Sequence, residues 1–129
     1  MKKSIPFLFL LLISFPACEE TPPTGSEDVI EFERVVFVIT SKEVVDNTFF
    51  VEGTVRNTGD ETFTPTWYME AQFYTDTQQS LKLGGSVDSF NFSLNKNETT
   101  QWELTYSNSD QNLDNYQDFG IGNLRAYKR

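Results

Sequence analysis

The chain has 129 residues, with 19 acidic and 10 basic side chains, a single cysteine and no histidine. Without histidine, Ser-His-Asp triads, imidazole acid–base catalysis and histidine-ligated zinc sites are excluded. The formal net charge of −9 repels phosphate backbones, so we expect no nucleic-acid partner.

The N-terminus has the order of a bacterial secretory signal. Two lysines precede an almost wholly apolar stretch over residues 5–15, and the small Ala17 stands just before Cys18. This stretch is shorter than the roughly 18 residues that a membrane-spanning helix needs. A cysteine at the cleavage point is typical of a lipoprotein, so we expect residues 1–17 to be the signal peptide and Cys18 to carry the lipid. The alternative is an ordinary cleaved signal followed by a chance cysteine.

Residues 18–28 are expected to form a flexible tether behind the lipid. They include two adjacent prolines and four acidic residues but no large apolar side chain, so they cannot bury enough surface to offset their ordering entropy. Acidic residues directly after Cys18 resemble the surface-export signals of Bacteroidota lipoproteins. That resemblance implies an outer-membrane lipoprotein, on either the periplasmic side or the cell surface.

From residue 29 onward, apolar and polar residues alternate with a period of two, which predicts strands rather than helices. The alternating segments are residues 35–39, 49–56, 67–74, 90–94, 102–106 and 119–126. Asn- and Gly-rich stretches at residues 57–60 and 95–97 supply turn residues between them.

Three of these segments have special features. Residues 35–39 are apolar on both faces, which predicts a strand that is covered on both sides or placed at a sheet junction. Gly84 and Gly85 interrupt the apolar pattern and predict a break between strands. In the last segment the apolar parity changes between Ile121 and Leu124, which predicts a β-bulge at residues 122–123.

The spacing of these segments predicts the fold class. About seven short strands in residues 29–129, with turn signals every 8–15 residues, are typical of an all-β, antiparallel two-sheet sandwich of the immunoglobulin type. A small closed β-barrel is the alternative. The length suits one domain with one core.

Three segments resemble FxLYD-type domains. The stretch FFVEGTVRNTGDETF at residues 49–63 is similar to the G-x-V-x-N-x-G core of that family, and WYMEAQFYTD at residues 67–76 is similar to its following strand. Residues 95–102 resemble the family's next turn and strand, without its Pro-Gly. The resemblance implies an immunoglobulin-like sandwich of the kind common in bacterial envelope proteins, with no catalytic residues to transfer.

Outward-facing aromatic residues are the candidate binding surface. If the alternation holds, Phe50, Tyr68 and Tyr74 point away from the core, where they could stack on sugar rings or on a protein partner. The alternative is that an edge or a loop covers them.

Residues 108–114 place oxygen-bearing side chains at alternate positions, as a calcium loop does. However, Leu113 replaces the glycine of such a loop, and Phe119 stands where its bidentate glutamate belongs. A solvated polar loop is therefore the preferred interpretation, and we expect no metal site.

These observations predict a lipid-anchored envelope protein that is not an enzyme. The single cysteine is expected to be acylated, so it is not available as a nucleophile, and Glu52, Glu70 and Glu103 are expected on outward strand faces as solvated charge. We expect a non-catalytic protein-binding or assembly module that needs no cofactor. A glycan-binding surface lipoprotein, using Tyr68 and Tyr74, is the alternative function.

Overall fold

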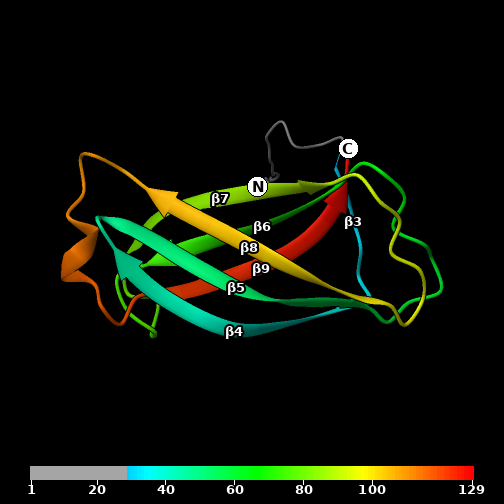
Figure 1. Ribbon diagram of the computed structural model, residues 1–129, viewed down its shortest axis with the longest axis horizontal. Coiled ribbons are helices and arrows are strands. Elements are labelled where there is room, and N and C mark those ends of the chain that lie inside the picture. The colour runs from blue at the N-terminus through cyan, green and yellow to red at the C-terminus, as the bar shows by residue number, and fades with distance from the viewer. Residues whose placement is uncertain (1–28) are drawn as a thin grey trace, which may run out of the picture.

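The computed structural model describes residues 29–129, which form strands joined by loops (Figure 1). The strands are β3 (Ile30–Glu31), β4 (Val35–Val45), β5 (Thr48–Asn57), β6 (Trp67–Tyr74), β7 (Lys82–Phe90), β8 (Thr99–Ser107) and β9 (Gly120–Lys128). The one helical element in this part of the chain is a short 3-10 turn, η4 (Leu113–Asn115). No helix within residues 29–129 is long and apolar enough to cross a membrane.

The strands form two antiparallel sheets. One sheet has the order β3-β9-β6-β7 and the other has the order β4-β5-β8. Figure 1 shows the three-stranded sheet lying across the four-stranded sheet. This arrangement confirms the expected immunoglobulin-like β-sandwich of about seven strands. The alternative of a closed barrel is wrong, because no strand of one sheet pairs with a strand of the other.

The core lies between the two sheets, and the strand alternation builds it. On β5 the side chains of Phe49, Val51 and Val55 are fully buried, while Glu52 and Arg56 on the opposite face are exposed. β6 and β8 follow the same rule, as predicted. The core is strongly aromatic: the ring of Phe49 stacks on that of Phe119 with centroids 3.9 Å apart. Such offset contacts add to the stabilisation from buried area.

Strand β4 is not covered on both sides, which is the first of the two placements that its sequence predicts. Among residues 29–129 it pairs with β5 alone and is therefore an edge strand of the described sandwich. Val36 and Val38 on its outward face are 48% and 49% exposed. The prediction of a strand covered on both sides is wrong, because the apolar residues of its outward face meet no second layer within residues 29–129.

Two further expectations fail near β7. Gly84 and Gly85 do not break the chain but lie inside the strand, and a Cβ at Gly84 would come within 2.5 Å of the Tyr106 hydroxyl. The glycine thus makes room for a packed tyrosine. The predicted strand at residues 90–94 is also wrong: β7 ends at Phe90, and one isolated bridge joins Leu94 to Phe63.

The predicted bulge in the last strand is confirmed. The pairing between β6 and β9 shifts register between Glu70 and Gln72, opposite Arg125 and Gly122. Asn123 has a positive φ of 53°, a conformation that asparagine tolerates better than most residues.

Candidate functional site

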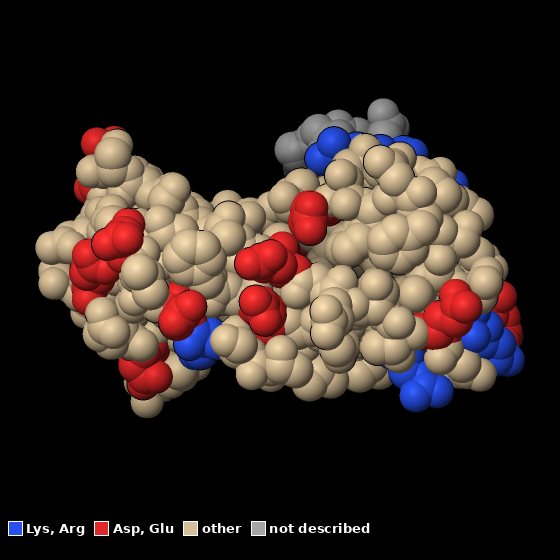
Figure 2. All heavy atoms as spheres, in the orientation of Figure 1, with Lys and Arg blue, Asp and Glu red and all other residues tan. Residues whose placement is uncertain are grey.

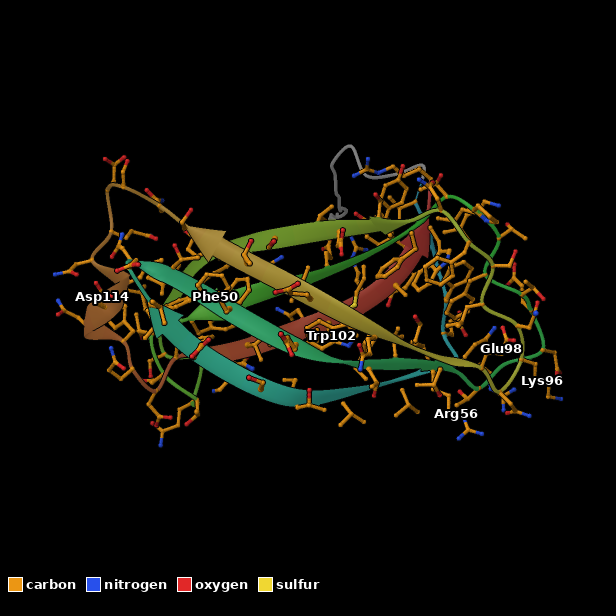
Figure 3. The ribbon with its side chains drawn as sticks, viewed as in Figure 1. Phe50, Arg56, Lys96, Glu98, Trp102 and Asp114 are labelled. Carbon is orange, nitrogen blue, oxygen red and sulfur yellow. The ribbon has the colours of Figure 1, made fainter. Side chains whose placement is uncertain are left out.

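The three aromatic residues predicted as a binding surface do not lie on one face. Phe50 is half-buried on the outward side of β5, in the three-stranded sheet (Figure 3). Tyr68 and Tyr74 belong to β6, in the other sheet. Tyr74 lies six positions after Tyr68, a distance of roughly 20 Å along the strand. A single ligand site that uses all three is therefore not formed.

Tyr74 is buried, with 8% of its surface exposed, so it is covered and does not belong to an open binding surface. Phe73 and Tyr74 follow each other at the end of β6, and both side chains are buried although they start from opposite faces of the strand. The Tyr74 hydroxyl accepts a hydrogen bond from Asn123 Nδ2 at 2.8 Å. A residue at the bulge of the neighbouring strand β9 thus satisfies this phenol, and its role is structural.

Tyr68 is half-buried in an aromatic and arginine cluster that the sequence did not reveal. Its ring stacks on that of Tyr127, with centroids 5.5 Å apart, and the Arg129 guanidinium lies 4.4 Å from its centroid. Burial raises the pKa of Tyr127 above its ordinary value of 10.0, and the nearby Glu70 carboxylate raises it further. Arg129 covers one face of Tyr68, so that face is not free to stack on a sugar.

The cluster is held in place by Arg125. Its Nε donates to Glu70 Oε2 at 2.9 Å, and its guanidinium lies 4.8 Å from the Tyr127 centroid. Hydrogen bonding to Glu70 raises the pKa of Arg125. Glu70, predicted as solvated charge, is therefore an ion-pair partner.

Acidic side chains mark the outward face of the three-stranded sheet. Glu52 on β5 lies directly opposite Glu103 on β8, and like charges in that position destabilise a sheet. Neither residue takes part in an ion pair among residues 29–129. Figure 2, viewed onto this face, shows acidic side chains over its middle and at both ends of the molecule.

An open cleft of about 380 Å³ adjoins these carboxylates, at the side of the sandwich where β7 approaches β8. Its lining residues are Thr40, Glu52, Gly53, Thr54, Asp88, Phe90, Gln101, Trp102 and Glu103. The indole of Trp102 is almost fully buried and donates through Nε1 to the Thr54 carbonyl at 2.8 Å. Trp102 therefore fills the base of the cleft as a core residue (Figure 3).

The predicted calcium-like loop at residues 108–114 is filled by a side chain from the β4–β5 hairpin. Asn47 Nδ2 donates to the carbonyls of Asn108 and Gln111, at 3.3 and 2.9 Å, and Asn47 Oδ1 accepts from the Leu113 N–H at 2.6 Å. Both carbonyls are thus occupied by an amide donor from the hairpin. Within residues 29–129, no three His, Cys, Asp or Glu side chains gather where they could hold a metal ion.

The opposite end of the sandwich is organised by a buried asparagine. Asn57 Nδ2 donates to the carbonyls of Glu61 and Leu94, at 2.8 and 2.9 Å, and Asn57 Oδ1 accepts from the Gly59 N–H at 3.0 Å. The sequence correctly marked residues 57–60 as a turn. It could not show that the asparagine side chain joins two loops that are far apart in the chain.

An exposed run of apolar residues to which the contacts described above assign no structural role lies on the β4 edge. Residues 35–39, here called the β4 edge segment, are all apolar, and Val36, Val38 and Ile39 are 48%, 49% and 38% exposed. The backbone of an edge strand offers unpaired N–H and C=O groups to an added strand. This segment combines that backbone with apolar side chains, so it is the candidate docking site.

The second half of β4 is protected against such pairing. Its register with β5 shifts at Thr40, and bulges make an edge a poor template for pairing. Lys42 pairs with the buried Val51, so it starts from the core side of the strand. Its Nζ donates to the Phe119 carbonyl at 2.5 Å and lies 5.0 Å from the Phe119 ring centroid. The bulge and the inward lysine leave only residues 35–39 open.

No family model matches the chain, and no curated protein or solved structure is significantly similar to it. The resemblance to FxLYD-type domains therefore stays a prediction. Cys18 and the tether at residues 18–28 lie outside the described residues, as does the signal peptide predicted at residues 1–17.

Proposed function

We infer that the protein is a lipid-anchored, non-catalytic protein-binding module of the bacterial cell envelope. The observation that carries this proposal is the β4 edge segment. Its exposed valines lie on a strand edge to which no other strand of residues 29–129 pairs, and strand addition in peptide recognition uses this combination. Main-chain hydrogen bonds would supply affinity, and alternate side chains would supply specificity.

The anchor is supported by the sequence alone. Residues 5–15 are apolar, and Ala17 and Cys18 follow at the expected cleavage point. Several acyl chains hold a protein on a membrane far more firmly than one. An outer-membrane location, on the periplasmic side or at the cell surface, is part of the proposal. The acidic tether would keep the sandwich clear of the lipid.

The geometry gives less support to glycan binding. Of the two tyrosines that it would use, Tyr74 is buried and one face of Tyr68 lies under Arg129. Sugar-binding aromatic platforms need an open ring face. We therefore place the binding function on β4 rather than on β6.

Two experiments test the proposal. Cys18→Ala should move the protein from the membrane fraction to the soluble fraction, while Ser26→Ala, in the tether, should leave it on the membrane. Continued membrane attachment of the Cys18→Ala variant would remove the lipid anchor from the proposal.

The second experiment tests the binding surface. A photo-crosslinking amino acid at Val38, introduced in living cells, should capture protein. The same group at Val87, which is 48% exposed on β7, is the matched control. Equal capture at both positions, or no protein capture at Val38, would contradict a binding role for the β4 edge segment.

A further inference from the structure

We propose that the protein docked on the β4 edge segment is a second copy of this chain. The two segments would pair antiparallel about a two-fold axis at Phe37 and join the two three-stranded sheets into one continuous sheet. This inference rests on the proposed function, because it names the partner of the same surface.

The limits of the pairing segment fix the position of the axis. β4 begins at Val35, and its register with β5 shifts directly after Ile39. Only the five residues between these points form a regular exposed edge. In an antiparallel pair with two-fold symmetry, the central residue lies opposite its own copy. Full overlap of the segment therefore requires Phe37 opposite Phe37 of the second copy.

This register brings only apolar side chains together. Val35 lies opposite Ile39 of the second copy, and Val36 lies opposite Val38 of the second copy. Pairs of β-branched residues across neighbouring strands each contribute about 0.2–1 kcal/mol. The exposed valines of both copies lie on the same outward face, since Val36 and Val38 have the same strand parity. The exposed apolar residues of the edge are thus self-complementary.

Charge disfavours the neighbouring register on the side of the bulge. If Val38 lay opposite its own copy, Arg34 would face Lys42 of the second copy, and Glu33 would face Glu43 of the second copy. Like charges directly opposite are unfavourable. That register would also draw the irregular Thr40 into the pairing. The register with Phe37 at the axis avoids both costs.

The other edge of the same sheet does not offer an equivalent surface. β8 lies beside β7, and residues of both strands line a shared surface hollow. β8 also carries the exposed Glu103 at its middle. Head-to-tail pairing of β4 of one copy with β8 of the next would build an open chain of copies. Pairing of β4 with β4 of a second copy uses the same edge on both copies and gives a closed dimer. In Figure 1, β4 forms the lower border of the ribbon over its middle. A closed dimer is the assembly that this edge permits.

The interface is short, so the dimer is expected to be weak. Contacts well below about 1,200 Å² of total buried surface are typical of transient complexes. Two chains tethered to one membrane meet at a higher effective concentration than two free chains. The dimer would therefore form at the membrane at protein levels that leave the released chain monomeric.

Cysteine crosslinking tests the register, because the chain has no cysteine other than Cys18. The experiment uses the full chain carrying Cys18→Ala, so that no native thiol competes. Variants Val36→Cys and Val38→Cys are oxidised separately and as a mixture. In the proposed register these positions lie opposite each other, at the Cα separation of about 4.5–5.5 Å that a disulfide spans. Two copies of position 38 are diagonal neighbours roughly 7–8 Å apart.

The mixture should therefore give several-fold more disulfide dimer than either variant alone, and Val87→Cys should give none. In sedimentation at high concentration, Val38→Lys should weaken dimerisation about tenfold or more, while Val87→Lys should leave it unchanged. A Val38→Cys variant that links to itself best would overturn the proposed register. A wild-type edge that stays monomeric at millimolar concentration would overturn the dimer.

The outcomes also separate this inference from the proposed function. If a photo-crosslinker at Val38 captures a different protein instead of a second copy, the binding role of the β4 edge segment stands and the dimer is wrong. If it captures a second copy, the result supports both the binding role of the β4 edge segment and the dimer. If it captures no protein, both the binding role of the β4 edge segment and the dimer are wrong.

Discussion

Asn57→Ala is predicted to be among the most destabilising exchanges of a polar residue in this domain. Asn57 is fully buried and makes three side-chain hydrogen bonds of 2.8–3.0 Å to backbone groups. A typical hydrogen bond contributes about 1 kcal/mol net, and leaving a buried partner unsatisfied costs about 1–3 kcal/mol. The loss should therefore be about 3 kcal/mol or more. For a domain of about 100 residues, this lowers Tm by roughly 12–24 °C.

The assay is thermal unfolding of the Cys18→Ala chain, followed by tryptophan fluorescence, because Trp67 and Trp102 are both buried. Asn91→Ala is the matched control, since Asn91 makes one exposed hydrogen bond with the Thr66 hydroxyl. It should change the free energy of unfolding by less than about 0.5 kcal/mol.

Asn57→Asp separates hydrogen bonding from packing. The aspartate has nearly the same shape and can still accept from the Gly59 N–H, but an ionised carboxylate cannot donate to the carbonyls of Glu61 and Leu94. At neutral pH it should destabilise at least as much as alanine. If Asn57→Ala and Asn91→Ala lower Tm by the same small amount, the buried asparagine does not hold the two loops together and the reasoning is refuted.

Three other predictions follow from single contacts. Asn47→Gly keeps the positive φ of the hairpin (58° at Asn47) but loses its side-chain bonds, so amide exchange across residues 108–114 should accelerate while β5 stays protected. Glu103→Lys should raise the free energy of unfolding by about 0.2–1 kcal/mol by replacing repulsion of Glu52 with attraction; a destabilised variant in urea unfolding would contradict this. The Ser80 N–H lowers the pKa of Asp76 below 3.8, so its stabilisation is complete above that pH and lost as the pH falls further. Acid unfolding of Asp76→Asn should therefore show a shallower pH dependence than the wild type.

The parts of the fold that the sequence predicted correctly are those in which one face of a strand is buried. On β5, β6 and β8, the period-two pattern places large apolar side chains in the core. The bulge in β9 was predictable for the same reason, because a change of apolar parity requires an extra residue if both halves face one core. These features depend only on the spacing of apolar residues along one strand and on which of its two faces is apolar.

The failures concern features that depend on what lies next to a strand. The sequence pattern of a run that is apolar on both faces, such as residues 35–39, does not distinguish a central strand from an exposed edge strand. Tyr74 follows the alternation of β6, but it is buried, and its hydroxyl is bonded to Asn123 of the neighbouring strand β9. Gly84 and Gly85 lie inside β7, where a Cβ at Gly84 would clash with Tyr106, more than 20 positions along the chain. No local pattern carries that information.

The candidate site was missed for the same physical reason, and the contrast within β4 explains why it is meaningful. Exposed apolar edges promote aggregation, so natural sheets protect them with bulges, inward charges or covering elements. Half of β4 has such protection, since Thr40 breaks the register and Lys42 is anchored to the Phe119 carbonyl. The same devices placed a few residues earlier would have closed the whole edge. Because residues 35–39 instead keep a regular strand with exposed valines, the unprotected half is best explained by a partner that pairs with it.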